Sequence, residues 1–388
     1  MCLKNDYIKP HIDSVLIDLV NICNYRCKFC WYHLDPKFQF LKTYRDNHFL
    51  FPLPKLFEFI CDLEKIKVKN LTITSEGEPT LHPDIGKIIK YIKDNTSIKL
   101  KMQTNGTYPN SLKKDILLLD EVYINLSFFT KRVFNTLNPG IKFNNDVVIA
   151  NIKDIKTHKK RPKIIIVYIL TRYNLSEIKN ALRSMNELGI DRVEFKPCEI
   201  VCSVNEDLMF NKKEAKQLAL ELLKQREYCN FDNNILEVAV DLTKNFYGKE
   251  HFKNNPKISS FGFSWRDWRE KAPEVAWCES DYILRSPDLK ACFYPLKYLY
   301  LRLNGELYTC PRNSWIDPVG NIFEKSLIDI LNSNEYKAVV KESIFNFDVN
   351  RPPWLRCKNC FDAEYHRRMF YKIKEIAPHL YKKIMKNK

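Results

Sequence analysis

The sequence lacks the apolar segments that would place a protein in or across a membrane. It contains no apolar run of about eighteen or more residues, the length needed for a membrane-spanning helix. Residues 1–13 also lack the apolar stretch of a secretory signal peptide. These absences predict a soluble, cytoplasmic protein with no membrane partner.

Acidic residues are also in short supply. The chain has 63 Lys and Arg against 47 Asp and Glu, a formal net charge of +16. Such a surplus suits nucleic acid, an anionic membrane surface or a phosphorylated substrate. The lysines are, however, scattered among many Asn and Ile residues, as expected from an AT-rich genome. In the densest basic stretches, 153–163 and 367–388, basic and aromatic residues are not interleaved as they would be in a platform for stacking bases. We therefore do not expect nucleic-acid binding.

Cysteine, in contrast, is abundant in the chain. Thirteen cysteines, an odd number, cannot all pair, and disulfides are rare in cytosolic proteins, so metal ligation is the expected use. The length of 388 residues and the apolar fraction of 45% suit one large domain plus a smaller one.

Three of these cysteines, Cys23, Cys27 and Cys30, follow the apolar run 15–20. Soft thiolate ligands select iron-sulfur clusters, zinc or Cu(I). His33 is close enough to complete a tetrahedral zinc site. The triplet alone therefore leaves zinc and an iron-sulfur cluster open.

Apolar segments alternate with helical patterns along the first half of the chain, which predicts parallel strands joined by crossover helices. In such sheets the functional loops follow the C-terminal ends of the strands, as the cysteine loop does. Asn174, with Glu177 three residues later, predicts a capping box, and 206–227 predicts a long helix. The six strands are expected at residues 15–20, 71–74, 98–103, 121–127, 163–170 and 191–196.

A second set of cysteines lies near the C-terminal end. Cys292 and Cys310 flank residues 298–309, which alternate around Asn304-Gly305, the strongest local hairpin signal. Cys357 and Cys360 add a Cys-x2-Cys pair. Four such cysteines suit either zinc or a 4Fe-4S cluster, and spacing alone does not decide between them.

The order Cys-x3-Cys-x-aromatic-Cys, with Phe29 in the aromatic position, resembles the cluster loop of the radical S-adenosylmethionine enzymes. The resemblance implies that Cys23, Cys27 and Cys30 hold a 4Fe-4S cluster whose open iron binds S-adenosylmethionine. It also implies that Phe29 lies near the adenine of that cofactor.

Further elements are similar to the same family. Gly77-Glu78-Pro79 resembles its Gly-Gly-Glu-Pro turn, which contacts the methionyl amino group, although Glu76 replaces the first glycine. The planar guanidinium of Arg172, at a strand end, suits the methionyl carboxylate. The resemblance also implies cofactor contacts for Gln103 and for Ser127, which otherwise reads as a turn former.

The C-terminal set resembles the SPASM and twitch domains of these enzymes, in the pattern Cys292-x12-Gly305-x4-Cys310 followed by Cys357-x2-Cys360. It implies one auxiliary 4Fe-4S cluster held by these four cysteines, with Cys278 as a spare ligand. His366 and Phe370 stand where a longer SPASM pattern continues with cysteines, so the twitch arrangement fits better.

The implied fold is α/β: a partial (β/α)6 TIM-like barrel with a smaller C-terminal domain that contains a β-hairpin and helices. We expect the barrel at residues 1–229, a connecting segment at 230–285, the auxiliary-cluster domain at 286–366 and a basic helix at 367–388.

The resemblance implies an enzyme that cleaves S-adenosylmethionine to a 5′-deoxyadenosyl radical and abstracts a substrate hydrogen atom. It implies an external electron donor, such as flavodoxin or ferredoxin. With an auxiliary cluster as electron acceptor, dehydrogenation or epimerisation of a small molecule, such as a sugar or an aminocyclitol, is expected. Only 22 residues precede Cys23, which favours a small substrate over a leader peptide. A peptide-modifying maturase with a separate leader-binding partner and a zinc-containing RNA-binding adaptor are the alternatives, and no catalytic base is identified.

Overall fold

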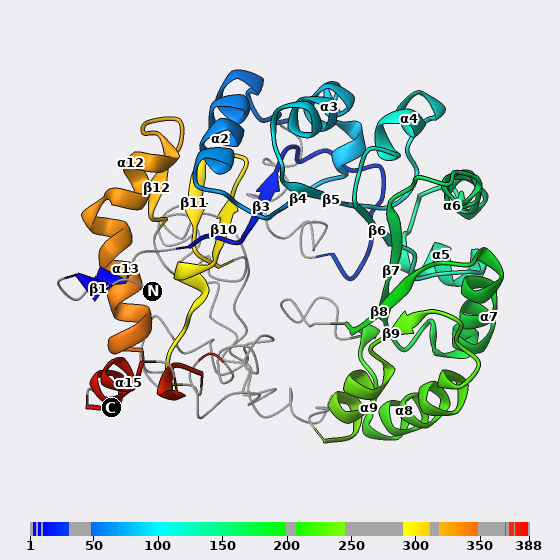
Figure 1. Ribbon diagram of the computed structural model, residues 1–388. Coiled ribbons are helices and arrows are strands. Elements are labelled where there is room, and N and C mark those ends of the chain that lie inside the picture. The colour runs from blue at the N-terminus through cyan, green and yellow to red at the C-terminus, as the bar shows by residue number, and fades with distance from the viewer. Residues whose placement is uncertain are drawn as a thin grey trace.

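The computed structural model describes residues 3–4, 7–8, 11–30, 48–198, 207–244, 290–310, 318–347, 369, 372–375 and 377–386. Within them a curved sheet carries helices along its outer side (Figure 1). Its ten strands lie in the order β12-β11-β10-β3-β4-β5-β6-β7-β8-β9.

Six parallel strands form the barrel part of this sheet, as the sequence predicts, and each pairs in register with the next. They are β3 (Ser14–Asp18), β4 (Asn70–Thr74), β5 (Lys99–Thr104), β6 (Glu121–Asn125), β7 (Lys163–Leu170) and β8 (Arg192–Pro197).

The connecting helices lie on the outside of the curve (Figure 1). Most of them bury apolar stripes against the strands, whereas the buried residues of the helix at Lys131–Leu137 belong to a second apolar cluster. In the helix after the cysteine loop, proline occupies the first turn, where its missing N–H costs nothing. These helices are α2 (Leu53–Lys65), α3 (Ile85–Asn95), α4 (Lys113–Ile116), α5 (Lys131–Leu137), α6 (Asn145–Thr157), α7 (Ile178–Leu188) and α8 (Lys212–Arg226).

Alternation along the strands separates an apolar outer face from a polar inner face. In β6, Val122 and Ile124 are fully buried in the core, while Glu121, Tyr123 and Asn125 point to the opposite face and are partly exposed. The inside of the barrel therefore carries polar side chains.

The sheet continues past residue 229, the expected end of the barrel. Strand β9 (Asp232–Asn233) pairs in parallel with β8, and α9 (Ile235–Lys244) packs on α8. Helix α8 begins at Lys212, six residues later than predicted, because Asn211 and Glu214 form a reciprocal capping box there.

The predicted capping box at Asn174 and Glu177 is wrong. The Asn174 amide instead donates to the carbonyls of Ser127 and Ile169, and the Glu177 carboxylate accepts from the backbone N–H groups of Phe129 and Thr130. Both side chains therefore join the β6 and β7 loops rather than cap their own helix.

The predicted C-terminal hairpin is present. Strands β10 (Tyr298–Leu301) and β11 (Glu306–Tyr308) pair antiparallel around Gly305, whose φ of +82° lies in the left-handed region. Strand β10 also pairs in parallel with β3, so the hairpin extends the barrel sheet. Strand β12 (Gly320–Asn321) and helices α12 (Leu327–Asn332), α13 (Asn334–Phe345) and α15 (Pro378–Lys386) follow.

Strands β1 (Leu3–Lys4) and β2 (Tyr7–Ile8) form a separate antiparallel pair. Among the helices in the described ranges, none combines the length and apolar character that crossing a membrane requires.

Candidate functional site

The cysteine loop leaves the C-terminal end of β3 and is anchored by aromatic and amide side chains. The ring of Tyr25 is buried and packs edge-on against Phe134, with 5.6 Å between the ring centroids. Its hydroxyl donates to Asn144 Oδ1 at 2.7 Å. Lys28 N–H donates to the Leu137 carbonyl at 2.8 Å, which ties the loop to the end of α5.

An apolar cluster lies beneath this loop. Cys23, Cys27 and Phe29 are partly buried and pack against it. The cluster keeps water from one side of the cysteines and places Phe29, a predicted cofactor residue, beside them. Its fully buried members are Tyr25, Phe128, Val133, Phe134, Leu137, Cys198 and Leu208.

The three thiols interact electrostatically with one another. Burial raises the pKa of Cys23 to about 12, with smaller increases from Glu78 and Cys30. Burial also raises the pKa of Cys27 well above its ordinary value, and the charges of Cys30 and Cys23 add to the shift. Thiols that resist ionisation this strongly require a bound cation to become thiolates.

The donor set itself is soft. Three cysteine sulfurs are the ligands that iron-sulfur clusters and zinc prefer. Among the residues that the structure describes, no three His, Cys, Asp or Glu side chains form a group that could hold a metal ion. His33, the proposed fourth zinc ligand, lies outside the described residues.

The Gly77-Glu78-Pro79 turn packs directly on the segment that joins β3 to the cysteine loop. Gly77 N–H donates to the Val20 carbonyl at 3.0 Å, and Glu78 N–H donates to the Ile22 carbonyl at 2.7 Å. A Cβ on Gly77 would lie 2.0 Å from the Ile22 oxygen. The close approach of the two backbones therefore requires glycine at this position.

The Glu78 side chain points into the protein. Its carboxylate accepts from Thr80 N and Oγ1, Thr104 Oγ1 and Asn105 N, at distances of 2.6 to 3.1 Å. Burial raises the pKa of Glu78, and these hydrogen bonds offset part of the increase. Glu78 thus fixes the turn against the end of β5, while a cofactor contact by its side chain stays a prediction.

An amide network that the sequence analysis missed connects the end of β5 to the cysteine loop. Asn105 Nδ2 donates to Asn24 Oδ1 at 2.7 Å, and Asn24 Nδ2 donates to Thr107 Oγ1 at 2.8 Å. The sequence analysis identifies Gln103 near this strand end, but the position of Asn24 between two cysteines gives no signal of its own.

A buried charged group joins the C-terminal hairpin to the same region. Arg302, directly after β10, forms an ion pair with Glu76, and their side chains are only 6% and 2% exposed. The Tyr300 hydroxyl donates to Asp18 at the end of β3. Burial and the nearby Glu76 charge raise the pKa of Asp18 to about 8. The replacement of the family's glycine by Glu76 is thus matched by an arginine more than two hundred residues away.

The inner face of the barrel carries a second charged network, also missed from the sequence. Tyr123 OH donates to Glu121 Oε2 at 2.8 Å, and Lys101 Nζ lies 3.1 Å from the same oxygen. Arg192 Nη2 donates to Tyr123 OH at 3.0 Å and to Glu194 Oε1 at 2.8 Å. These partly exposed side chains come from β5, β6 and β8 and form a polar surface inside the barrel.

Three further predicted cofactor residues lie at strand ends. Gln103 is exposed on the inner face and accepts a long hydrogen bond from Thr74 Oγ1, at 3.4 Å. Arg172 donates to Glu214 Oε1 at 2.9 Å, so its guanidinium already binds a carboxylate.

Ser127 is fully buried, accepts from Ile169 N–H at 2.8 Å and donates to Asn125 Oδ1 at 2.9 Å. The contacts of Gln103, Arg172 and Ser127 with S-adenosylmethionine stay predictions, and Ser127 would have to exchange one of its bonds.

The second cysteine set is described only in part. Cys292 is buried, and its N–H donates to the Ser343 carbonyl at 2.8 Å, while Cys310 is partly exposed at the end of the hairpin. Cys357, Cys360 and Cys278 lie outside the described residues. Of the cysteines outside the two sets, Cys198 is buried, whereas Cys61 is exposed and its sulfur lies 3.3 Å from Tyr91 OH.

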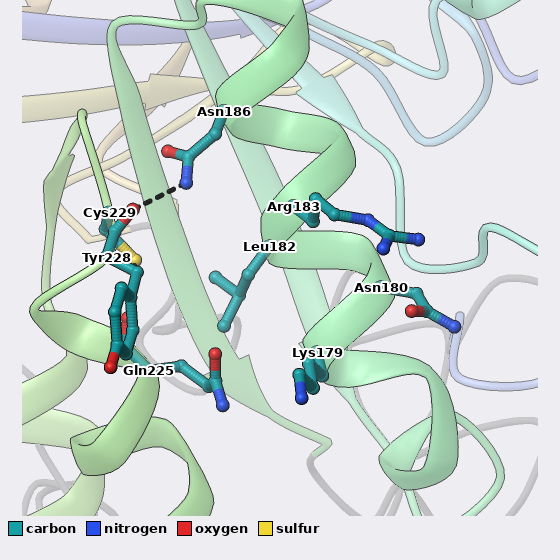
Figure 2. Close-up of a pocket in the computed structure, with 8 residues that line it drawn as sticks. All are labelled: Lys179, Asn180, Leu182, Arg183, Asn186, Gln225, Tyr228 and Cys229. Atoms are coloured by element: carbon teal, nitrogen blue, oxygen red, sulfur yellow. Dashed lines mark hydrogen bonds between the residues drawn. The ribbon is translucent and has the colours of Figure 1, made fainter.

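A cavity of about 200 Å³ lies elsewhere, between α7 and the end of α8 (Figure 2). It is bordered by the hydrogen bond from Asn186 Nδ2 to the Tyr228 carbonyl, at 2.6 Å. Lys179 and Arg183 line it from α7, and none of the predicted cluster or cofactor residues does. We therefore do not assign the site to it.

Known families match both parts of the chain. Residues 17–185 match the radical SAM superfamily, and residues 292–361 match SPASM, an iron-sulfur cluster-binding domain. The probable GTP 3′,8-cyclases of Sulfurisphaera tokodaii and Metallosphaera sedula are each 27% identical to this chain, over 185 and 189 residues respectively. These regions cover 47% and 48% of this chain and 55% and 56% of the relatives, so the chain spans about half the length of the curated relatives that it matches.

Solved structures share the fold. SuiB of Streptococcus suis, bound to its precursor peptide SuiA, aligns with a TM-score of 0.56 at 17% identity, over 86% of this chain and 67% of SuiB. The enzyme anSMEcpe with bound AdoMet and the Cp18Cys peptide also gives 0.56, at 16% identity, over 97% of this chain and 100% of that protein. The two family matches show that this chain carries a radical SAM domain at residues 17–185 and a SPASM domain at residues 292–361, the domain types whose cofactors are S-adenosylmethionine and 4Fe-4S clusters.

Proposed function

We propose that the protein abstracts a hydrogen atom from a small polar substrate, such as a sugar or an aminocyclitol, and oxidises or epimerises it. The observation that carries the substrate class is the charged network on the inner face of the barrel, from Lys101 through Glu121 and Tyr123 to Arg192 and Glu194. Hydroxyl and amino groups of a polar substrate can hydrogen-bond to such side chains, whereas an apolar substrate would cover these charged groups without offering a hydrogen bond in return.

We assign Cys23, Cys27 and Cys30 as ligands of the cluster that binds S-adenosylmethionine, and Cys292, Cys310, Cys357 and Cys360 as ligands of an auxiliary 4Fe-4S cluster. When bound, the first cluster and S-adenosylmethionine supply a 5′-deoxyadenosyl radical, and the auxiliary cluster supplies an acceptor for the second substrate electron. An external donor such as flavodoxin or ferredoxin is expected to deliver the initiating electron.

The protein's own contribution is to position the reactants and to exclude water. The apolar cluster beneath the loop covers Cys23 and Cys27, and Tyr25 and Lys28 hold the loop in place. Holding reacting atoms in a fixed, dry site lowers the entropic cost of reaction and prevents side reactions of a radical.

The balance of charge in the inner-face network sets which substrate groups it prefers. The pKa of Glu121 is lowered because hydrogen bonds from Tyr123 and Lys101 outweigh its burial, so its carboxylate stays ionised at neutral pH. Arg192 and Lys101 accompany it, and the face can therefore pair with both donors and acceptors of a polyhydroxylated substrate.

A peptide substrate is the second candidate, because the fold matches over most of the chain are to SuiB and anSMEcpe, both solved with bound peptides. The curated relatives are named for GTP, which adds a nucleotide to the substrates worth testing.

Anaerobically reconstituted protein should be incubated with S-adenosylmethionine, a strong reductant and panels of deuterated sugars and aminocyclitols, nucleotides and peptides. We expect deuterium to appear in 5′-deoxyadenosine with a sugar-type substrate and not with Cys27→Ala. Transfer from peptides alone would establish the second candidate and overturn the first.

Variants of the inner face test its role in binding. Glu121→Gln and Arg192→Leu should raise the KM for the sugar-type substrate, each by tenfold or more on the scale of about 1.4 kcal/mol per factor of ten, because each leaves a charged partner unmatched. Arg183→Leu, on the outer surface, is the matched control and should leave the KM unchanged.

A further inference from the structure

Asn138 ends α5 and places a buried side-chain amide against one of the three cysteines. Its backbone is held on both sides: Asn138 N–H donates to the Phe134 carbonyl at 2.7 Å, and its own carbonyl accepts from Ile141 N–H at 3.2 Å. The residue is 0% exposed. Its side chain reaches Cys27, whose Sγ lies 3.0 Å from Asn138 Oδ1 and donates to it.

The other half of the same amide is left over. Asn138 Nδ2 is buried and has no hydrogen-bond partner among the described residues. A buried donor without an acceptor costs about 1 to 3 kcal/mol. Such a donor in a native structure calls for an explanation, and an absent ligand is one of the usual ones.

The chemistry of cysteine supplies that explanation. A thiol donates a hydrogen bond, but a metal-bound thiolate can only accept one. A carbonyl oxygen 3.0 Å from a thiolate sulfur would place two acceptors in contact. Rotating the amide by a half-turn exchanges its oxygen and nitrogen with almost no change of shape, and puts the unpartnered N–H group at the sulfur.

We infer that Asn138 Nδ2 donates a hydrogen bond to the Cys27 sulfur when Cys27 is a cluster ligand, and that this bond sets the reduction potential of the cluster that binds S-adenosylmethionine. Hydrogen bonds to the sulfurs stabilise the more negative, reduced state and so raise the potential. The inference rests on the proposed assignment of Cys27 as a ligand. Asn138 is a positioning and tuning residue in this reading, because it acts through the sulfur.

The chain offers a matched control in Asn144. This second asparagine also holds the cysteine loop, but its amide oxygen accepts from the Tyr25 hydroxyl rather than from a cysteine. A general loosening of the loop would affect both asparagine variants, whereas loss of an N–H···S bond affects only Asn138→Leu, which has nearly the same shape as asparagine.

The experiment compares reconstituted wild type, Asn138→Leu and Asn144→Leu by redox titration under electron paramagnetic resonance, with the relevant cluster identified as the one whose signal changes on adding S-adenosylmethionine. We expect the midpoint potential to move to a more negative value in Asn138→Leu only. An Asn138→Leu potential equal to that of the wild type would overturn the inference.

A measurement on the wild-type protein covers the case in which Asn138→Leu loads no iron. The protein is prepared with asparagine that carries ¹⁵N only in its side-chain amide. Pulsed electron paramagnetic resonance should then detect a hyperfine coupling between ¹⁵N and the reduced cluster, and Asn144→Leu should retain this coupling. Absence of that coupling would refute the bond. A cluster signal that survives unchanged in Cys27→Ala would instead remove the ligand assignment itself, so the two failures are distinguishable.

Discussion

Removing Arg302 should destabilise the protein strongly, because it leaves a buried carboxylate without its arginine. In Arg302→Met the Glu76 carboxylate, only 2% exposed, loses that partner. Breaking a buried ion pair from one side typically costs about 3 to 5 kcal/mol.

The magnitude follows from the burial of both partners. Their side chains are only 6% and 2% exposed, so the full cost of a one-sided loss applies. The loss of stability in Arg302→Met should therefore be about 3 to 5 kcal/mol, apart from the lost packing of the arginine side chain.

The assay is chemical unfolding of Arg302→Met, Glu76→Gln and the double variant at neutral pH. The double variant should recover most of the stability that Arg302→Met loses, because the unpaired carboxylate is then gone. Arg183→Met removes one partner of an exposed pair with Glu187, 72% and 70% exposed, and should change stability by less than about 1 kcal/mol. A loss in Arg302→Met no larger than that of Arg183→Met, or a double variant no more stable than Arg302→Met, would refute the reasoning.

Three other perturbations test separate parts of the structure. The pKa of Asp18 is raised from 3.8 to about 8, so between these values the folded protein holds a proton that the unfolded chain releases. The stability that this proton contributes is therefore lost as pH rises from 3.8 to about 8. Asp18→Asn should make the decrease of stability with pH smaller, as measured by thermal unfolding from pH 5 to pH 8. Gly77→Ala places a Cβ 2.0 Å from the Ile22 oxygen and should abolish iron loading or folding, with iron content and circular dichroism as the readouts. Asn211→Ala removes the hydrogen bond from Glu214 N–H and should lower the free energy of unfolding by about 1 kcal/mol, as measured by chemical unfolding. An unchanged free energy of unfolding would mean that the capping box contributes nothing.

The sequence predicted what local patterns determine. The six parallel strands follow from apolar runs, and the hairpin follows from Asn304-Gly305, because these signals act between neighbours in the chain. The cysteine loop is recognisable because its three cysteines lie within eight residues of each other.

The parts that could not be predicted depend on tertiary contacts. Glu76 and Arg302 are 226 residues apart, and nothing in either local sequence identifies the other. At Asn174 the local pattern was misleading, since the carbonyls of Ser127 and Ile169 hold the amide that would otherwise cap a helix. The amide of Asn138 likewise gains its significance only from the fold, which brings it to Cys27.

The pairing of β10 with β3 has a consequence for how the protein is made. Strand β3 is the first strand of the barrel, yet its outer edge is covered by a strand that follows it by about 280 residues, as the Tyr300–Asp18 contact shows. Until the hairpin has been synthesised, that edge presents unpaired backbone groups to other chains, the usual route to aggregation. A barrel expressed without the hairpin should therefore aggregate, because β10 covers the edge of β3 that would otherwise pair with other chains.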